Sequence, residues 1–487
     1  MKNIGYKKMI KAFAFILLIL FLGRPLIERG LSHIPTLNDD KYTIQVVDDS
    51  GFKVKLEKPA TRIISLYSAH TENLFSLDLG DEIIGVGTSE AFPHEALEKP
   101  VFDYKADPEK VIAAQPDLVV IRPFIERNNP GFVNALRRAG ITVVSLYPDN
   151  AGEFEAYIER LAILTGREKK AAQLLDDFYE DLAYLESLTK DIDPRVGVYF
   201  ESSDREYKTI TPESMAARAI EIAGGRNLAT DVTPVQEGSS IAIFGLEEII
   251  NIGHEIDVFV TQRGVMGGGG NYHSISIRPG FDTIKAIKNK RVLEINQKII
   301  SSPTFRQVLG VVELMRFFYP DTFNDYSEFK VDQALRRRDF AKLTVNYMQK
   351  PLFIPTASYF RSDYRGHKFG YFEDIEEDDL DYYFIETAVL SGYISGYKVD
   401  LLEYFEPNQL VTKEEVAKFI FLVGDYKNLN KNLVINDLDQ YQAYRTIEIL
   451  VENGVFSLDE AGNFNGHETL TGNEIIDLLE KVRVTDD

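Results

Sequence analysis

Aromatic and cationic side chains recur directly after the apolar runs of this chain, where a small molecule could be held. Tyr67 and His70 follow the run RIISL at 62–66, and Arg122 follows DLVVI at 117–121. A guanidinium pairs bidentately with carboxylate or catecholate oxygens, a tyrosine ring stacks on flat ligands, and a histidine can donate, accept or bind metal. The same reasoning selects five further residues, which are Tyr207, Arg263, Tyr272, Arg278 and Arg306. Together they predict a site for an anionic or ring-bearing ligand.

Each of these side chains also has an ordinary structural explanation. Tyr67 and His70 could fill the neighbourhood of a helix that Ser68 or Thr71 caps, and an arginine is most often solvated. Glu72 lies in the first turn of that expected helix, where the helix dipole favours a carboxylate.

Motifs of established enzyme chemistry are absent from the sequence. There is no Gly-x-Ser-x-Gly elbow, and none of the seven histidines belongs to a His-Glu-x-x-His motif. The glycine run Gly267–Gly270 is followed by no Lys-Ser/Thr and no helix, so we expect a flexible loop rather than a phosphate-binding one. We therefore expect no catalytic activity and no cofactor. A bare-metal receptor that uses His70 and His273 stays open as an alternative.

Composition narrows the class of partner. The 487 residues carry 76 acidic and 54 basic side chains, a net charge of -22, which argues against nucleic acid or anionic lipid as the main partner. The chain is long enough for two or three domains, and its 44% hydrophobic content supports real cores. It has no cysteine, which excludes disulfides and a thioether-linked lipid anchor.

The N-terminus has the pattern of an export signal. Lys2, Lys7, Lys8 and Lys11 precede the apolar run 12–23, and no small-x-small cleavage site follows clearly. We expect either a removed signal peptide or an uncleaved membrane anchor, and in both cases an exported chain.

Alternating short apolar runs and helical patterns position the candidate residues. Residues 42–56 predict a hairpin, and from Arg62 the order strand, helix, strand predicts a parallel sheet, which restarts near residue 195. Between the two lies a proline-free stretch, 153–189, that predicts one long amphipathic helix. Ligands of parallel sheets sit beyond the carboxyl ends of the strands, so both sets of strand ends should face one cleft.

The last part of the chain contains an internal repeat. The acidic stretch 372–382 opens a first copy, and a second copy follows at an offset of about sixty residues, so that Asp374 matches Asp437 and Thr412 matches Thr471. We expect an α/β fold of two parallel-sheet lobes joined by a long backbone helix, followed by a small, mainly α-helical repeat domain. The expected parts are 1–40 (signal peptide or anchor and spacer), 41–165 (N-terminal lobe), 166–193 (backbone helix), 194–330 (C-terminal lobe), 331–371 (linker) and 372–487 (two repeats).

Residues 42 to about 325 resemble the periplasmic-binding-protein family for iron complexes, haem and cobalamin. The resemblance is carried by phrases in the family's order, among them ATRIISLYSAHTENLFSLDLGDEIIGVG, PEKVIAAQPDLVV, AGITVVSLYP and AIKNKRVLEI. It implies a receptor that delivers its ligand to an ABC permease, a glutamate on each lobe that docks onto that permease, and limited hinge closure. We match these glutamates to Glu72 and Glu247, with Glu248 as the other possibility in the second lobe.

Residues 372 to about 483 resemble S-layer homology motifs, which hold proteins to cell-wall polymer. The family's TRAE signature stands here as TKEE at 412–415 and TGNE at 471–474. The resemblance implies that Lys413 meets the polymer in one copy, while the other copy lacks the basic residue. We identify two copies and no third.

These observations predict an exported solute receptor for an ABC importer, held at the cell surface by the N-terminal segment, the repeats or both. The expected ligand is a ferric siderophore, with haem or a corrinoid as alternatives, and the rival interpretation is a structural wall protein whose lobes have lost transport.

Overall fold

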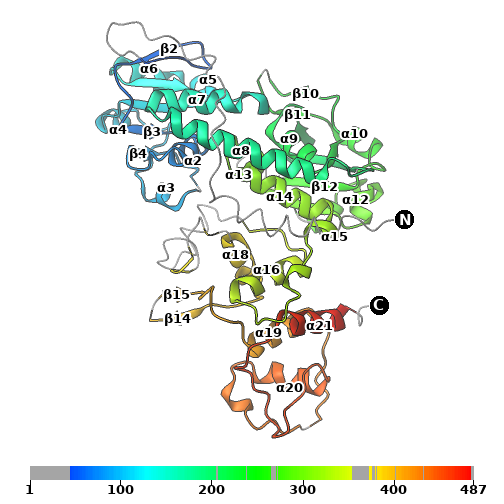
Figure 1. Ribbon diagram of the computed structural model, residues 1–487. Helices are drawn as coiled ribbons and strands as arrows, with labels where there is room; N and C mark the ends of the chain where they lie inside the picture. Colours follow the sequence, from blue (N-terminus) through cyan, green and yellow to red (C-terminus); the bar gives the residue numbers. More distant parts are fainter. Residues whose placement is uncertain are drawn as a thin grey trace. The chain divides into compact units, whose positions relative to one another are not determined.

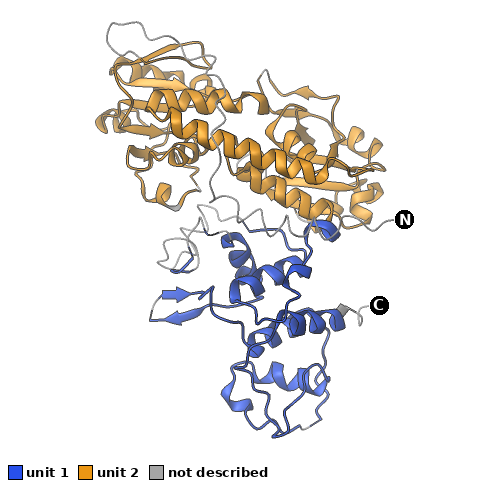
Figure 2. Cartoon of the chain, viewed as in Figure 1, with its two compact units in different colours: residues 1–34, 320–355, 362–487 blue, residues 35–319, 356–361 orange. Residues whose placement is uncertain are grey.

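The computed structural model describes residues 44–90, 92–204, 207–236, 238–264, 270, 272–353, 372–375, 379, 381–400, 402–431 and 433–483. They form two compact units, coloured orange and blue in Figure 2. We call residues 44–319 the two-lobe unit and residues 320–483 the C-terminal unit. The predicted export signal lies outside the described residues. Within the part of the chain that is described, no helix is both long and apolar enough to cross a membrane.

The two-lobe unit opens with the predicted hairpin. β1 (Ile44–Val47) pairs with β2 (Lys53–Leu56) in antiparallel register, with Ile44 opposite Leu56. The Asp48 carboxylate accepts hydrogen bonds from the backbone N–H of Phe52 at 2.8 Å and of Ser145 at 3.1 Å. One buried aspartate therefore closes the turn and fastens the hairpin to the first lobe.

The first lobe is a parallel sheet with helices around it (Figure 1). Its strands are β3 (Ile63–Ser65), β4 (Ile83–Val86), β5 (Leu118–Ile121) and β6 (Thr142–Ser145), in the order β4-β3-β5-β6. Its helices are α2 (Ser68–Ser76), α3 (His94–Glu98), α4 (Glu109–Ala113), α5 (Pro123–Asn128) and α6 (Pro130–Arg138). All four residues of β5 are fully buried, as expected for a strand covered on both faces.

Two helices, rather than the one predicted over 153–189, join the lobes. α7 (Phe154–Thr165) ends at Gly166, and α8 (Glu168–Thr189) follows. Gly166 adopts φ 68°, and a Cβ there would meet Pro59 at 2.9 Å, so glycine provides both the left-handed turn and the space. The buried face of α8 includes Phe178, Leu182 and Leu185, in agreement with the predicted amphipathic pattern.

The second lobe repeats the topology of the first. Its parallel strands are β7 (Val196–Glu201), β9 (Gly225–Asn227), β12 (Val258–Arg263) and β13 (Val292–Asn296), in the order β13-β12-β7-β9. A small antiparallel sheet of β8 (Lys208–Ile210), β10 (Thr233–Pro234) and β11 (Ile241–Ile243) adjoins it. The helices are α9 (Met215–Ile222), α10 (Leu246–Asn251), α11 (Tyr272–Ser276), α12 (Lys285–Lys288), α13 (Gln297–Ile300) and α14 (Gln307–Phe318). In both lobes the first strand lies between the second and third, and the fourth is at the edge next to the third.

The C-terminal unit is mainly helical. Its helices are α15 (Pro320–Phe323), α16 (Arg337–Tyr347), α18 (Tyr382–Leu390), α19 (Lys413–Val423), α20 (Tyr444–Glu452) and α21 (Gly472–Arg483), with short 3-10 turns η5 (Ser327–Phe329) and η6 (Leu438–Gln440) and the hairpin β14 (Tyr397–Val399)–β15 (Leu402–Tyr404). Phe419 lies at the centre of its core, with the rings of Phe340 and Tyr393 at centroid distances of 5.8 and 5.3 Å. The predicted linker 331–371 therefore needs correction, because α16 belongs to this core.

Three repeats, rather than two, form the C-terminal unit. Three lead-in segments precede α16, α19 and α21, and they pair cyclically through the isolated bridges Ala334↔Thr471, Arg336↔Leu410 and Thr412↔Thr469. A phenylalanine stands eight residues before the start of each helix: Phe329 before Arg337, Phe405 before Lys413 and Phe464 before Gly472. The backbone N–H groups of those helix starts donate to Gln409, Glu468 and Gln333 in turn, which closes the ring.

Candidate functional site

The two predicted residues that follow β3 and β5 lie together, because these strands are neighbours in the first sheet. The Arg122 guanidinium stacks over the Tyr67 ring at 4.8 Å and over the Phe124 ring at 4.7 Å. Tyr147, just beyond β6, places its ring 6.0 Å from that of Tyr67. We call Tyr67, Arg122, Phe124 and Tyr147 the aromatic shelf. Its side chains are partly exposed and lie at the carboxyl ends of the strands.

The phenols of the aromatic shelf are neutral hydrogen-bonding groups. Burial raises the pKa of Tyr67 and of Tyr147 above the ordinary value of 10.0.

His70 lies inside the first lobe rather than at a binding surface. It is fully buried, and burial lowers its pKa to about 3, so the ring is neutral. Nδ1 is 2.7 Å from the Tyr157 hydroxyl and Nε2 is 3.2 Å from the Ile121 carbonyl, which can only accept. Nε2 therefore carries the proton and Nδ1 accepts from Tyr157. Both nitrogens are used, which leaves neither for the ligand or metal that the sequence suggested.

Glu72 is also buried, and its carboxylate already has a partner. It is 5% exposed, and the Arg306 guanidinium donates to its two oxygens at 2.7 and 2.8 Å. The same guanidinium lies over the Phe92 ring, with 4.1 Å from its carbon to the ring centre. Glu72 and Arg306 therefore connect α2 of the first lobe to the loop after α13 of the second. The permease contact predicted for Glu72 would require this pair to open.

A lysine of the second lobe also reaches the first lobe, and the sequence did not suggest it. Lys298 on α13 donates to the Ser68 hydroxyl and, at 2.9 Å, to the Ser89 carbonyl. Burial raises the pKa of the nearby Glu90 to about 7 and lowers that of Lys298 to about 8. Glu90 follows β4 and Lys298 follows β13, and no local sequence pattern shows that these two strand ends, one from each lobe, lie near each other.

Two further predicted arginines are neutralised within the second lobe. Arg278 donates to the buried Glu201 carboxylate, at 3.1 Å from Nη2 to Oε1. Arg263 binds Glu294 bidentately at 2.6 and 2.7 Å, and its side chain is 63% exposed. Within the described residues no carboxylate pairs with Arg122, so it is the one predicted guanidinium without an acidic neighbour there.

The predicted tyrosines of the second lobe lie apart from one another. Tyr207 adopts φ 51° and packs its ring 6.2 Å from that of Phe281, at the edge of the lobe's core. Tyr272 opens α11 and is 36% exposed. Of the glycine run, residues 267–269 lie outside the described residues. Across the described ranges, no group of three or more His, Cys, Asp or Glu side chains is arranged to hold a metal ion.

Glu247 is exposed, and the first lobe offers a topological equivalent. Glu247 and Glu248 lie in the first turn of α10, the short helix before the third strand of its sheet. In the first lobe the helix before the third strand is α4, and its first residue, Glu109, is exposed as well. The matching topology therefore pairs Glu247 with Glu109 and not with Glu72.

Lys413 makes a contact between neighbouring repeats of the C-terminal unit. Its ammonium donates to the Phe464 carbonyl at 2.5 Å and lies 4.4 Å from the centre of that ring, and burial lowers its pKa. The fully buried Arg337 does the same one repeat earlier, donating to the Phe405 carbonyl at 2.7 Å. In the third copy Gly472 stands at this position, where a Cβ would meet the Phe329 carbonyl at 1.8 Å.

Comparisons with known proteins agree with both parts of this architecture. A family model described as periplasmic binding protein matches residues 63–299, and one described as S-layer homology domain matches residues 434–476. The chain is 30% identical over 292 residues to an uncharacterised ABC transporter substrate-binding lipoprotein of Bacillus subtilis, covering 58% of this chain and 88% of that one. It is 26% identical over 266 residues to a vitamin B12-binding protein of Vibrio parahaemolyticus, covering 54% and 90%. Among solved structures, a possible iron-binding, periplasmic solute-binding protein of Staphylococcus epidermidis aligns with 25% identity and a TM-score of 0.48, over 54% of this chain and 100% of that one.

Proposed function

The chain belongs to the periplasmic-binding-protein family of ABC-transporter substrate-binding proteins, and from that premise we propose that it is a cell-surface receptor for a corrinoid of the cobalamin type. As a member of this family it is a solute-binding receptor that serves an ABC transporter of the iron, haem or vitamin B12 type. We propose no catalytic role for it.

The choice of ligand rests on one observation, which is that three of the arginines predicted to bind the ligand form ion pairs with glutamates of the protein. Arg263, Arg278 and Arg306 each bind a carboxylate of the same unit. A guanidinium that is already paired offers little net charge to a ligand. A corrinoid presents its periphery mainly as neutral carboxamides, whereas ferric catecholates and haem carry anionic groups. The neutralised arginines thus favour the corrinoid.

The aromatic shelf suits the same ligand. A flat macrocycle can stack on the rings of Tyr67 and Phe124, and its amides can accept from or donate to the neutral phenols of Tyr67 and Tyr147. The 26% identity to a vitamin B12-binding protein supports this choice.

A ferric siderophore is the second candidate, and Arg122 is the observation in its favour. Its guanidinium stacks on rings but pairs with no carboxylate of the described residues. It could therefore receive an acidic group of a siderophore, or equally a haem propionate.

Thermal unfolding of the full chain with each ligand tests these proposals. A ligand present at a hundred times its dissociation constant adds about 2.7 kcal/mol, which raises the midpoint of a unit of this size by roughly 5 to 10 °C. The proposal expects this shift with cyanocobalamin and a smaller one with ferric catecholates, ferric hydroxamates and haem. A shift with a ferric siderophore alone would favour the second candidate. No shift with any ligand would favour the structural wall protein.

For the permease we propose Glu109 and Glu247 as the docking pair. Both are exposed carboxylates in the first turn of the helix before the third strand, so the two lobes present them equivalently. Glu72, which the sequence suggested, is held by Arg306 instead.

For surface retention we propose that the C-terminal unit binds cell-wall polymer, in keeping with the S-layer homology match at 434–476. Lys413 remains the residue proposed to meet an acidic group there. An ammonium has three donors, and the Phe464 carbonyl uses one of them. A membrane anchor at the N-terminus stays a prediction. Co-sedimentation of the full chain with purified wall material tests the wall proposal. The chain should pellet with the wall material, and a chain that stays in the supernatant would contradict the proposal.

A further inference from the structure

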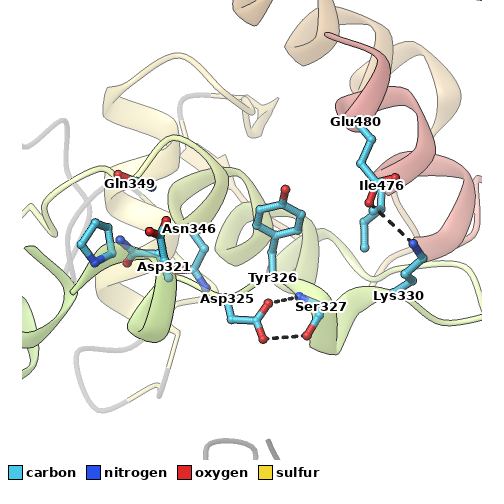
Figure 3. A pocket seen from close by; sticks show the side chains of 11 residues that line it. Asp321, Asp325, Tyr326, Ser327, Lys330, Asn346, Gln349, Ile476 and Glu480 are labelled. Carbon is cyan, nitrogen blue, oxygen red and sulfur yellow. Dashed lines mark hydrogen bonds and ion pairs between the residues drawn. The ribbon is translucent and has the colours of Figure 1, made fainter. Parts of the chain in front are cut away.

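The C-terminal unit contains a crevice of about 340 Å³ (Figure 3). The charged side chains that line it are all exposed, and they are Asp321, Asp325, Lys330 and Glu480. Exposed charges exchange a protein partner for water at little cost, so they select a ligand only weakly. A buried charge is different, because it cannot give up its partner freely, and the second lobe of the two-lobe unit contains one at a strand end.

Glu201 is this buried carboxylate, and it lies at the carboxyl end of β7, the edge at which parallel sheets bind ligands. It is 1% exposed and accepts from both Nη atoms of Arg278, at 3.1 Å from Nη2. The Thr261 hydroxyl, opposite Glu201 on β12, lies 3.4 Å from the carboxylate. The Arg278 side chain is 17% exposed. The guanidinium therefore reaches solvent at the ligand edge, while the carboxylate that balances its charge does not.

The fold itself does not require a charge at this position. Tyr199 stands two residues earlier on the same face of β7, and its ring packs 5.7 Å from that of Phe244 and 5.2 Å from that of Phe259. An apolar side chain in place of Glu201 would continue this core. Replacing a buried ion pair by apolar residues often leaves stability unchanged or raises it, so stability alone does not explain the pair.

Arg278 differs from Arg263, the other paired arginine at this edge, in how firmly its charge is held. Arg263 binds Glu294 bidentately, but its side chain is 63% exposed, so a ligand anion could replace Glu294 at little cost. Arg278 cannot turn to a ligand anion without leaving the Glu201 carboxylate buried and unpaired. Glu201 thus withholds the charge of Arg278 from a ligand, whereas Glu294 leaves that of Arg263 accessible.

We propose that Glu201 is a specificity-determining residue, which neutralises Arg278 and thereby disfavours anionic ligands relative to uncharged ones. The inference rests on the proposed receptor function and deepens it, because it assigns discrimination by charge to one residue. Glu201 acts through Arg278 and does not itself contact the ligand.

Two ferric siderophores that differ mainly in charge test the inference on the full chain. A ferric tris-catecholate is anionic, and the second probe is an uncharged ferric trihydroxamate. Glu201→Gln keeps the shape of the side chain and releases the charge of Arg278. By calorimetric titration it should raise the affinity for the catecholate about tenfold and change that for the hydroxamate by less than about twofold. A ratio of the two affinities that equals that of the wild type would overturn the inference.

Glu255→Gln is the matched control for the loss of one negative charge. Glu255 binds Arg226 at 3.2 Å and precedes β12, so it lies at the amino ends of the same sheet, away from the ligand edge. Glu201→Asp is the control for charge, because it shortens the side chain but keeps the carboxylate. Both variants should keep the wild-type ratio. If either raises it as much as Glu201→Gln does, net charge or packing is responsible and the inference is overturned.

The double variant Glu201→Gln with Arg278→Gln keeps the test decisive if the single variant does not fold. It strands no buried charge, and it should bind the two siderophores in the wild-type ratio, since the native pair is already neutral. A catecholate affinity about tenfold below that of the wild type would show that Arg278 serves the anion in the native protein. That result would overturn the inference.

Cyanocobalamin separates this inference from the proposed ligand. A wild type that binds cyanocobalamin, with a siderophore ratio that Glu201→Gln does not alter, contradicts the role of Glu201 alone. A wild type that does not bind cyanocobalamin, but gains catecholate affinity through Glu201→Gln, contradicts the corrinoid proposal and supports the role of Glu201.

Discussion

The pair Glu72–Arg306 should stabilise the two-lobe unit far more than a pair of the same geometry at the surface. Arg306→Met keeps an apolar stem against Phe92 but leaves the Glu72 carboxylate without its guanidinium. The two side chains are 10% and 6% exposed, so the loss strands a buried charge. Breaking a buried pair in this way costs about 3 to 5 kcal/mol, or roughly 6 to 20 °C in the midpoint of a unit of this size.

Arg263→Met is the matched control, because Arg263 binds Glu294 with the same two-pronged geometry at the surface. The distances are 2.6 and 2.7 Å, against 2.7 and 2.8 Å for Arg306, but the Arg263 side chain is 63% exposed. An exposed pair contributes about 0 to 1 kcal/mol. Burial is the main difference between the two pairs, so it should account for most of the difference in stability.

Scanning calorimetry of the full chain measures both variants, since it can separate the transitions of the two units. The double variant Glu72→Gln with Arg306→Met removes the stranded charge and should recover much of the loss. If Arg306→Met and Arg263→Met lower the unfolding midpoint equally, or if the double variant recovers no stability, the Glu72–Arg306 pair does not stabilise the junction between the lobes.

Three further predictions follow from the two-lobe unit. Arg122→Ala removes a cation from the aromatic shelf and should weaken an anionic ligand about tenfold but a corrinoid only about twofold to threefold, as measured by calorimetric titration. Glu109→Arg combined with Glu247→Arg should abolish uptake in cells while ligand affinity stays unchanged. Glu90 has a folded pKa of about 7, raised from 4.5, so its contribution to stability is present below pH 4.5 and lost as the pH rises through 7. The stability of the wild type relative to Glu90→Gln should therefore fall over that range, as followed by thermal unfolding at several pH values.

The first two of these predictions have controls in the same unit. Arg127→Ala alters an exposed arginine of α5 and should leave all ligands unaffected, and Glu168→Arg alters an exposed first-turn glutamate of α8 and should leave uptake intact. Uptake that survives the double charge reversal would contradict the docking pair. A stability difference from Glu90→Gln that stays level between pH 4.5 and 7 would contradict the buried position of that carboxyl.

The lobes could be predicted from the sequence because their signals are local. Short apolar runs separated by helical patterns are the mark of parallel strands, and the placement of Tyr67 and Arg122 at adjacent strand ends followed from that alone. The break between α7 and α8 is not predictable from the hydrophobic pattern of residues 153–189, and the contact with Pro59 shows why a glycine stands at 166.

The roles of the charged residues could not be predicted in the same way. Whether Glu72 meets solvent or Arg306, 234 residues away, depends on how the lobes meet, and no local pattern contains that information. His70 is a similar case, since its partners Tyr157 and Ile121 come from other elements.

The first of the three repeats carries a different signal from the other two. The TKEE-like signature does not identify it, because Arg336, Arg337 and Arg338 stand where the other copies have TKE and TGN. The eight-residue spacing from Phe329 to Arg337 is the same as in the other copies, and it reflects the contact that each helix start makes with the next lead-in segment.

Calorimetric titration of the full chain with cyanocobalamin, beside a ferric hydroxamate, a ferric catecholate and haem, tests the central claim most directly. The receptor proposed here should bind one cyanocobalamin per chain, more tightly than any of the other three. A correctly folded chain that binds none of them would contradict the assignment of these lobes to ligand capture.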